Sequence, residues 1–262
     1  MLPIPPSKAW LARLSKLDTR KGREEENLFL AEGWKIVREC FEAGLGCQGL
    51  LVSEPEVEGD DLKELLVASK SGPYEIFTLP ESQFQKAATT RNPQGILGVF
   101  DRPPRQSPEV LKEIHGVVVV LDAVQDPGNV GTAIRCAAGL GASAVALTEG
   151  CADVWNPKTL RASAGALFRL PYVPSVPSEL LGKTLAANGF AVWIADAEGA
   201  PVGEVETIPQ RLAIVFGNES RGAGRTWERL ADAKKVGLPL ARGVESLNVG
   251  AAVAAMLAAL AK

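Results

Sequence analysis

The sequence predicts an α/β protein of two domains, in which the larger, C-terminal domain contains a parallel sheet. Along the 262 residues, segments with helical spacing of apolar residues alternate with short apolar runs typical of strands. Runs such as Val117–Leu121 lack polar residues at alternate positions, which indicates strands covered on both faces. Pro103, Pro104 and Pro108 separate the two stretches of alternation, so we place the domain boundary there.

The first domain, expected at 1–102, has the pattern of a small layered α/β fold. Apolar residues from Trp34 to Phe41 recur at helical spacing, and Gly44 is placed to end that helix. A strand, a helix, a strand, a helix and a strand are then expected in turn, at 48–53, 60–70, 74–79, 80–89 and 95–100. The Pro-rich residues 103–115 predict an extended linker.

The second domain, expected at 116–262, continues the alternation to the end of the chain. Strands are expected at 117–121, 144–148, 169–173, 190–195, 212–216 and 235–238. Helices are expected at about 129–140, 157–167 and 178–187, with a final one from about 246. The most apolar run, Val249–Ala261, contains 13 residues, and a membrane-spanning helix needs about 20. We therefore expect a buried terminal helix and no membrane partner.

The charge of the chain is uneven. The net charge of −3 does not indicate a nucleic-acid-binding protein, but the segment from Lys8 to Arg23 contains six basic residues and one acidic residue. Such a patch can supply phosphate contacts in an otherwise acidic chain, and Arg20, Lys21 and Arg23 are the candidates. A solvated helix face is the competing explanation, and on charge alone it is the commoner one.

Several classes of site are disfavoured. The four cysteines match no zinc or iron–sulfur spacing, and His115 is the only histidine, so we expect no metal and no Ser-His-Asp triad. The absence of a signal-peptide pattern in the first ten residues and the unpaired thiols favour a cytoplasmic protein. The glycine pattern at 44–49 resembles a dinucleotide fingerprint, but a helix precedes it and a strand follows, which is the wrong order for phosphate binding.

Polar residues gather at three strand ends of the second domain. Asn129 follows the first strand at a turn, and Arg135 lies in the next helix. Glu219 follows a later strand in a glycine-rich loop, and Ser246 and Asn248 introduce the final helix. Taken singly, each has a structural explanation, as a helix cap, a surface charge or a turn acid. In a parallel sheet, however, the carboxyl ends of strands meet at one edge, where ligands bind.

Taken together, these clusters resemble the three motifs of the SpoU/TrmH family of RNA ribose 2′-O-methyltransferases in the SPOUT superfamily. The resemblance is carried by NVGTAIRCA, GNESRGAG and LPLARGVESLNVGAA, which occur in the family's order. The intervening segment NPKTLRASAGALFRLP is similar to the family's segment there. Phe29–Gly33 resembles the FxxEG entry of the ribosomal-protein-like RNA-binding domain that many members carry before the catalytic domain.

The resemblance implies a parallel sheet with a deep trefoil knot, a smaller N-terminal α/β RNA-binding domain and a homodimer that packs knot against knot. It implies S-adenosylmethionine as the methyl donor. By position, the cofactor contacts would be Phe216, Gly217, Asn218, Leu238, Pro239 and Leu247. The catalytic residues would be Arg135, Asn129, Glu219, Ser246 and Asn248.

The implied reaction transfers a methyl group to a ribose 2′-hydroxyl of RNA, with 23S ribosomal RNA as the expected substrate. A guanidinium does not surrender its proton readily, so we expect Arg135 to hold a phosphate and to stabilise the developing alkoxide. The proton would leave through Glu219 or water. The alternatives are a tRNA ribose 2′-O-methyltransferase and a non-catalytic RNA-binding ribosome-assembly factor. A nicotinamide enzyme is disfavoured because no phosphate-binding loop is present.

Overall fold

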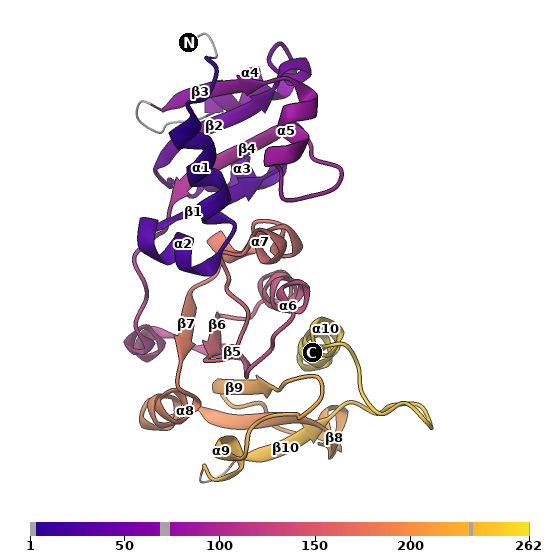
Figure 1. Cartoon of the computed structure of the whole chain (residues 1–262). Helices are drawn as coiled ribbons and strands as arrows, with labels where there is room; N and C mark the ends of the chain where they lie inside the picture. Colours follow the sequence, from indigo (N-terminus) through magenta and orange to yellow (C-terminus); the bar gives the residue numbers. More distant parts are fainter. Residues whose placement is uncertain (1–3, 69–73, 231–232, 262) are drawn as a thin grey trace. The chain divides into compact units, whose positions relative to one another are not determined.

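The computed structural model describes residues 4–68, 74–230 and 233–261, and the chain forms two compact units (Figure 1). One unit comprises Met1–Pro104 together with Trp155–Phe168. The other comprises Arg105–Val154 and Arg169–Lys262. The segment Trp155–Phe168, which the sequence pattern places in the second domain, therefore packs with the first unit.

The first unit is built on a sheet of four described strands in the order β1-β4-β2-β3. These are β1 (Leu28–Glu32), β2 (Cys47–Ser53), β3 (Glu75–Leu79) and β4 (Ile96–Asp101). β4 pairs antiparallel with both β1 and β2, and β2 pairs parallel with β3. The sequence pattern predicted β2, β3 and β4 within two residues. It did not predict β1, whose short apolar run, Leu28–Ala31, lies between the charged segment Arg20–Glu26 and Glu32.

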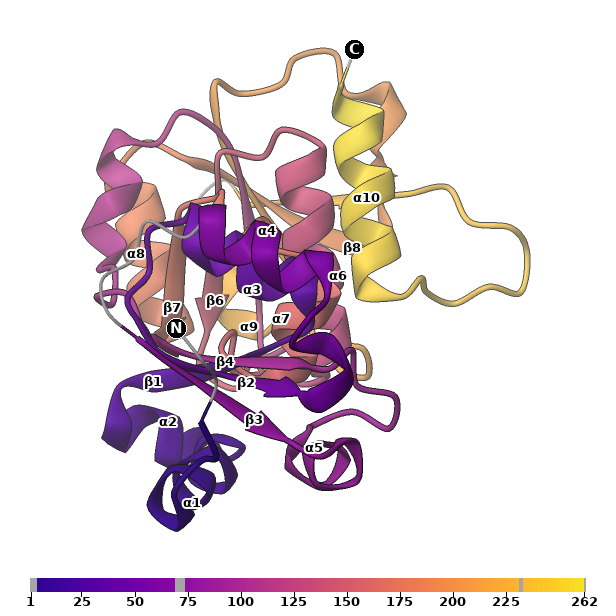
Figure 2. The ribbon, with the colours of Figure 1, turned by 90° about the horizontal axis from the view of Figure 1, so that it is seen from above.

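Helices cover both faces of this sheet (Figure 2). The unit's α-helices are α1 (Lys8–Leu17), α2 (Arg20–Glu26), α3 (Trp34–Glu42), α4 (Asp60–Ala68), α5 (Glu81–Ala87) and α7 (Pro157–Ser163), with short 3-10 turns at Glu54–Glu56 and Ala166–Phe168. α1 and α5 pack on one face, against Leu28 and Leu30. Phe29 points to the other face, where its ring lies 4.6 Å from that of Trp155. The Trp155–Phe168 segment is thus part of this unit's core.

The second unit contains a sheet of six described strands in the order β10-β8-β9-β5-β6-β7, and every neighbouring pair is parallel. The strands are β5 (Gly116–Leu121), β6 (Ala144–Thr148), β7 (Tyr172–Val176), β8 (Ala191–Pro201), β9 (Arg211–Phe216) and β10 (Lys234–Gly237). α6 (Pro127–Gly139) and α10 (Val249–Leu260) pack against each other, whereas α8 (Ser178–Ala187) and α9 (Arg225–Glu228) join the core cluster on the opposite face. The predicted parallel sheet with two covered faces is confirmed.

Some local expectations were wrong. The segment expected to be an extended linker forms a 3-10 helix at Pro108–Glu113, because Leu111 is fully buried in the core of the second unit. β7 begins at Tyr172 rather than at 169, and the last helix begins at Val249 rather than at about 246. Another 3-10 turn lies at Val202–Glu204. Among the described residues, none of the helices combines the length and apolarity needed to span a bilayer.

Candidate active site

A cavity of about 410 Å³ is bordered by Ile194–Ala197 in the middle of β8, by the segments that follow β9 and β10, and by α10. Five of the six residues expected to contact the cofactor border it, namely Phe216, Gly217, Asn218, Leu238 and Leu247. Glu219 and Ser246 border it as well. Within the described part of the chain, Pro239 is not among the bordering residues, although both of its neighbours are. The residues that follow β9 and β10 therefore border one pocket.

The loop after β9 is a tight turn that projects Glu219. Asn218 and Gly222 exchange backbone hydrogen bonds, with N···O distances of 3.1 and 2.9 Å, and Gly222 has a φ of +67°. A Cβ atom at Gly217 would lie 2.0 Å from the backbone nitrogen of Ala223. Only glycine allows the two ends of the loop to approach this closely. The glycines of this motif therefore set the position of the glutamate between them.

Glu219, Asn129 and Asn248 form a hydrogen-bonded chain, which we call the strand-end cluster. The Asn129 side-chain amide donates to Glu219 Oε1 at 2.6 Å, and the Asn248 amide donates to Asn129 Oδ1 at 2.7 Å. Asn248 Oδ1 in turn accepts from the backbone N–H groups of Gly250 and Ala251. Because backbone N–H groups only donate, they fix the orientation of both amides. Glu219 is left as the acceptor at the end of the chain.

The cluster forms because α10 lies close against α6. A Cβ atom at Gly250 would lie 2.5 Å from Cγ2 of Thr132, so glycine permits the approach. The cap of α6 is Asp126, which accepts from the backbone N–H of Asn129 at 3.0 Å. Asn248, and not Ser246, caps α10. The capping explanation considered for Asn129 and Ser246 is therefore wrong, and the Asn129 side chain is available to Glu219.

Arg135 is not brought into the cavity of its own chain. Its side chain is exposed on α6, and it is not among the described residues that border the cavity. It follows Asn129 by six residues, which in an α-helix amounts to about 9 Å along the axis and about 120° around it. The helix thus presents Asn129 and Arg135 in different directions.

Charged residues that the motifs did not indicate occupy the rim of the cavity. The Lys235 ammonium lies 2.9 Å from Glu228 Oε1 and 3.1 Å from Asp196 Oδ2. Hydrogen bonds to Glu228 and then to Asp196 raise the pKa of Lys235, so it remains protonated and is no candidate base. Asp196 directly follows the predicted strand at 190–195, so it could have been predicted from the sequence as a polar residue at a strand end. Nothing in the sequence pattern indicates Lys235 or Glu228.

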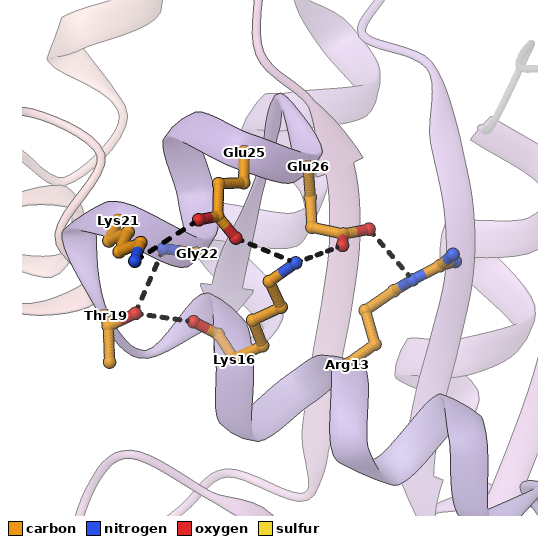
Figure 3. Close-up of polar contacts among 7 residues, drawn as sticks. All are labelled: Arg13, Lys16, Thr19, Lys21, Gly22, Glu25 and Glu26. Atoms are coloured by element: carbon orange, nitrogen blue, oxygen red, sulfur yellow. Dashed lines mark hydrogen bonds and ion pairs between the residues drawn. The ribbon is translucent and has the colours of Figure 1, made fainter.

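The three predicted RNA contacts lie on α2, and two of them, Arg20 and Lys21, have acidic partners. Figure 3 shows Lys21 beside Glu25. Lys21 lies 3.7 Å from Glu25, and Arg20 lies 2.9 Å from Glu24. On α1, Lys16 is held by Glu25 and Glu26 (Figure 3). Three glutamates, Glu24, Glu25 and Glu26, directly follow the basic segment Lys8–Arg23 and balance much of its charge.

The prediction for Arg23 was wrong. Its side chain is 1% exposed, and Nη1 donates to the backbone oxygens of Leu17 and Asp18 at 2.9 Å each. These carbonyls end α1 and lack partners within the helix, so the guanidinium completes the C-terminus of α1. A Cβ atom at Gly22 would lie 1.9 Å from the Lys16 backbone oxygen, so glycine at this position allows α2 to lie close to the C-terminal end of α1. Arg23 is therefore a structural residue.

Ion pairing shifts the titration of this helix pair. The hydrogen bond with Lys16 lowers the pKa of Glu26, and the hydrogen bond with Arg20 lowers the pKa of Glu24. The pKa of Lys16 is raised, chiefly by Glu26 and then by Glu25. All these groups therefore stay ionised at neutral pH, and their charges remain paired.

The chemistry offered by the strand-end cluster is that of a fixed proton acceptor. One carboxylate oxygen of Glu219 is held by Asn129, and Glu219 lies at the edge of a cavity large enough for a small cofactor. The arrangement suits removal of a proton from a hydroxyl group placed beside a bound methyl donor.

Comparisons with known proteins agree with this geometry. Residues 116–258 match the SpoU rRNA Methylase family, and residues 11–98 match an MRM3-like substrate binding domain. The chain is 33% identical over 246 residues to a 23S rRNA (guanosine(2553)-2′-O)-methyltransferase, RlmP, from Bacillus subtilis, covering 92% of each chain.

Solved structures of similar proteins share the whole architecture. A putative RNA methyltransferase of the TrmH family from Porphyromonas gingivalis is 31% identical, with a TM-score of 0.82 over 97% of both chains. The SpoU methyltransferase AviRb from Streptomyces viridochromogenes, in complex with AdoMet, is 26% identical, with a TM-score of 0.83 over 97% of both chains. The similarity thus includes both units and a cofactor-bound relative.

Proposed function

Because the chain belongs to the SpoU rRNA methylase family, we propose that it transfers a methyl group from S-adenosylmethionine to a ribose 2′-hydroxyl of 23S rRNA. The single observation that carries this proposal is the strand-end cluster beside the cavity, where Asn129 and Asn248 orient Glu219. A non-catalytic RNA-binding protein has no need for a carboxylate held in this way.

The cavity fits the methyl donor. Its wall combines apolar side chains, Phe216, Leu238 and Leu247, with the backbone of Gly217, and its volume of about 410 Å³ accommodates a nucleoside-sized ligand. When bound, S-adenosylmethionine supplies an electrophilic methyl group. Phe216, Gly217, Asn218, Leu238 and Leu247 would hold it, and Ser246 lies at the same wall. Pro239 is a weaker candidate for a cofactor contact, because it is not among the described residues that line the cavity.

The chain's own residues then manage the proton and the charge. Glu219 Oε1 is engaged by Asn129, so Oε2 accepts the proton of the 2′-hydroxyl. The Asn248 amide keeps Asn129 in the orientation that donates to the carboxylate. The Arg135 guanidinium holds the adjoining phosphate and stabilises the alkoxide as it forms.

We propose that Arg135 acts in the site of a second copy of the chain. It lies about 120° around α6 from Asn129, and it does not border the described cavity of its own chain. We propose a homodimer, formed by the knotted unit, in which each chain's Arg135 completes the partner's site. The small residues of α10 and the exposed Leu140 at the end of α6 supply the apolar contact surface.

The remaining parts of the proposal concern topology and substrate delivery. We propose that the chain after β9 forms the trefoil knot of the family, with β10 at the sheet edge and α10 returning to α6. The N-terminal unit, matched by a substrate binding domain, would bind the rRNA. Arg20 and Lys21 remain candidates there as peripheral phosphate contacts only. The rRNA substrate favours the cytoplasm as the working compartment.

Methyl transfer is the direct test. Purified protein is incubated with S-adenosylmethionine carrying a labelled methyl group and with 23S rRNA or, separately, tRNA, and the RNA is digested to nucleosides for mass spectrometry. A labelled 2′-O-methylnucleoside from 23S rRNA is expected. If the label appears in tRNA alone, tRNA and not 23S rRNA is the substrate. If calorimetry detects no binding of S-adenosylmethionine, the proposed methyltransferase activity is refuted.

A further inference from the structure

A buried carboxylate and hydroxyl, Asp122 and Thr148, lie behind the loop that carries Glu219. Asp122 is 7% exposed at the end of β5, and Thr148 is 1% exposed at the end of β6. Neither borders the described cofactor cavity, whereas both border a second cavity that shares Asn218, Arg221 and Gly222 with the first. The loop after β9 therefore separates this pair from the cofactor cavity.

The pair is connected to both ends of that loop. At the far end, the backbone N–H of Gly224 donates to Asp122 Oδ2 at 2.8 Å. At the near end, the backbone N–H of Asp122 donates to the Phe216 oxygen at 2.8 Å, and the Asn218 amide donates to the Ala123 oxygen at 3.1 Å. The loop that projects Glu219 is thus attached at both ends to the two residues Asp122 and Ala123.

Thr148 fixes those two residues. Its hydroxyl donates to Asp122 Oδ1 at 2.8 Å and accepts from the backbone N–H of Ala123 at 2.9 Å. Ala123 has a φ of +54°, a left-handed conformation that costs an alanine free energy. Such a conformation persists only where the surroundings enforce it, and it marks turns whose geometry matters. Here the Thr148 hydroxyl and the Asn218 amide enforce it.

We propose that Asp122 and Thr148 are positioning residues that hold the loop from Gly217 to Gly224, and with it the Glu219 carboxylate, in the geometry that proton transfer requires. They touch neither cofactor nor substrate, and they act through the backbone of Gly224 and the turn at Ala123. The expected loss of turnover rests on the proposed function. The claim that the two residues hold the loop does not depend on it. Small misplacements of a catalytic group lower turnover steeply.

The test compares four variants of the full chain. Asp122→Ala removes both acceptors, whereas Asp122→Asn can still accept from Gly224 and donate to the Thr148 hydroxyl. Thr148→Val removes the hydroxyl at constant shape, and Thr148→Ser restores it. Thr184→Val is the matched control, because its hydroxyl donates to the Leu180 oxygen one turn earlier in α8.

Amide hydrogen exchange of the loop in the apo protein is the first readout. Asp122→Ala and Thr148→Val should raise exchange in the peptide containing Gly217–Gly224 by about tenfold or more, with β5 and β9 unchanged. Turnover is the second readout, and in Asp122→Ala and Thr148→Val it should fall by about 10- to 100-fold. Asp122→Asn and Thr148→Ser should restore both to within about threefold of wild type.

Each outcome decides the question. Unchanged loop exchange in folded Asp122→Ala and Thr148→Val overturns the inference, and so does a rise spread evenly over the sheet, which signifies a general loss of stability. Loss of activity that the conservative variants do not restore also contradicts it. If wild-type protein transfers no methyl group, the proposed function fails, and the exchange data still decide whether the pair holds the loop.

Discussion

In the α1–α2 helix pair, charged groups satisfy one another, whereas in the strand-end cluster one carboxylate is oriented by amides from other segments. Lys16 is held by two glutamates, and Arg23 is buried against the carbonyls that end α1. Glu219 is held by Asn129, which lies 90 positions earlier in the chain. Helix packing and solvation explain the first arrangement fully. The second has no comparable structural explanation, since Glu219 is exposed at the tip of a turn.

The difference separates two kinds of sequence evidence. A count of charges along one segment ignores partners that follow in the next turn of helix. Polar residues at the ends of different parallel strands are brought together by the fold itself. The predictions below test whether activity depends on the strand-end cluster and whether the helix pair is dispensable.

The largest effects are expected from Arg135→Ala and Glu219→Gln, made in separate chains. Arg135→Ala should lower turnover by about 10³-fold, because stabilisation of the transition-state charge is lost. Glu219→Gln should lower it by about 10²-fold, because proton removal is lost. In mixed dimers, one of the two sites would combine an intact Glu219 with the partner's intact Arg135. Mixing the two inactive proteins under subunit exchange should therefore restore activity.

The control is a mixture of each variant with itself, carried through the same exchange. Restored turnover in the heteromixture alone supports the shared site. No recovery, when mass spectrometry shows that mixed dimers have formed, would mean that Arg135 acts within its own chain.

Glu219→Gln by itself separates proton transfer from binding. Glutamine keeps an oxygen that accepts from Asn129, so the loop and the cofactor cavity should persist. Turnover should fall by about 100-fold, while the affinity for S-adenosylmethionine, measured by calorimetry, changes by less than about threefold. An equal loss of both would assign Glu219 to cofactor binding instead.

The sequence was sufficient for the parallel sheet, since Val118–Leu121 of the predicted strand are buried on both faces. It also placed Asn129, Glu219 and Asn248 near one edge of that sheet, and the structure brings these three side chains within hydrogen-bonding distance of one another. It could not show that Asn248 caps α10 while it orients Asn129, because that depends on Gly250 lying against Thr132.

Other features depend on tertiary contacts that leave no periodic signal. β1 has a short apolar run that ends in the charged Glu32, and burial of that glutamate depends on the tertiary fold. The Pro-rich segment is part of a core because Leu111 is buried there, and Arg23 is buried although the charged residues Lys21 and Glu24 beside it are exposed. Whether a basic residue is a ligand contact or a helix cap depends on where the preceding helix ends, and sequence gives helix ends least precisely.

A smaller effect is expected from Arg23→Met, which tests the structural role. Removing the guanidinium leaves the Leu17 and Asp18 carbonyls without its donated hydrogen bonds. The free energy of unfolding should fall by about 2–3 kcal/mol. Lys21→Met is the matched control on the same helix, and it should change stability by less than about 0.5 kcal/mol. Urea denaturation measures both, and equal effects would contradict a special role for Arg23.

The smallest effect concerns RNA affinity. If the glutamates neutralise the helix pair, Glu25→Gln with Glu26→Gln should release Lys16, Lys21 and Arg13 and raise RNA affinity several-fold. The rise should shrink as salt increases. Glu58→Gln with Glu81→Gln makes the same change in net charge at exposed positions elsewhere in the unit. An equal rise in both double variants would show that only overall charge matters.

Lowering the pH is a weaker way to release the same cations. The pKa of Glu26 is lowered by its hydrogen bond to Lys16, so the stability from this pair is complete above the ordinary carboxyl range. It is lost only as the pH falls through the lowered folded value. Between pH 7 and pH 5 the Glu26–Lys16 pair should therefore persist. The RNA affinity of wild-type protein, measured by filter binding, should rise less over this range than it does in the double variant. A gain at pH 5 equal to the mutational one would show that the glutamates are not held by the lysine.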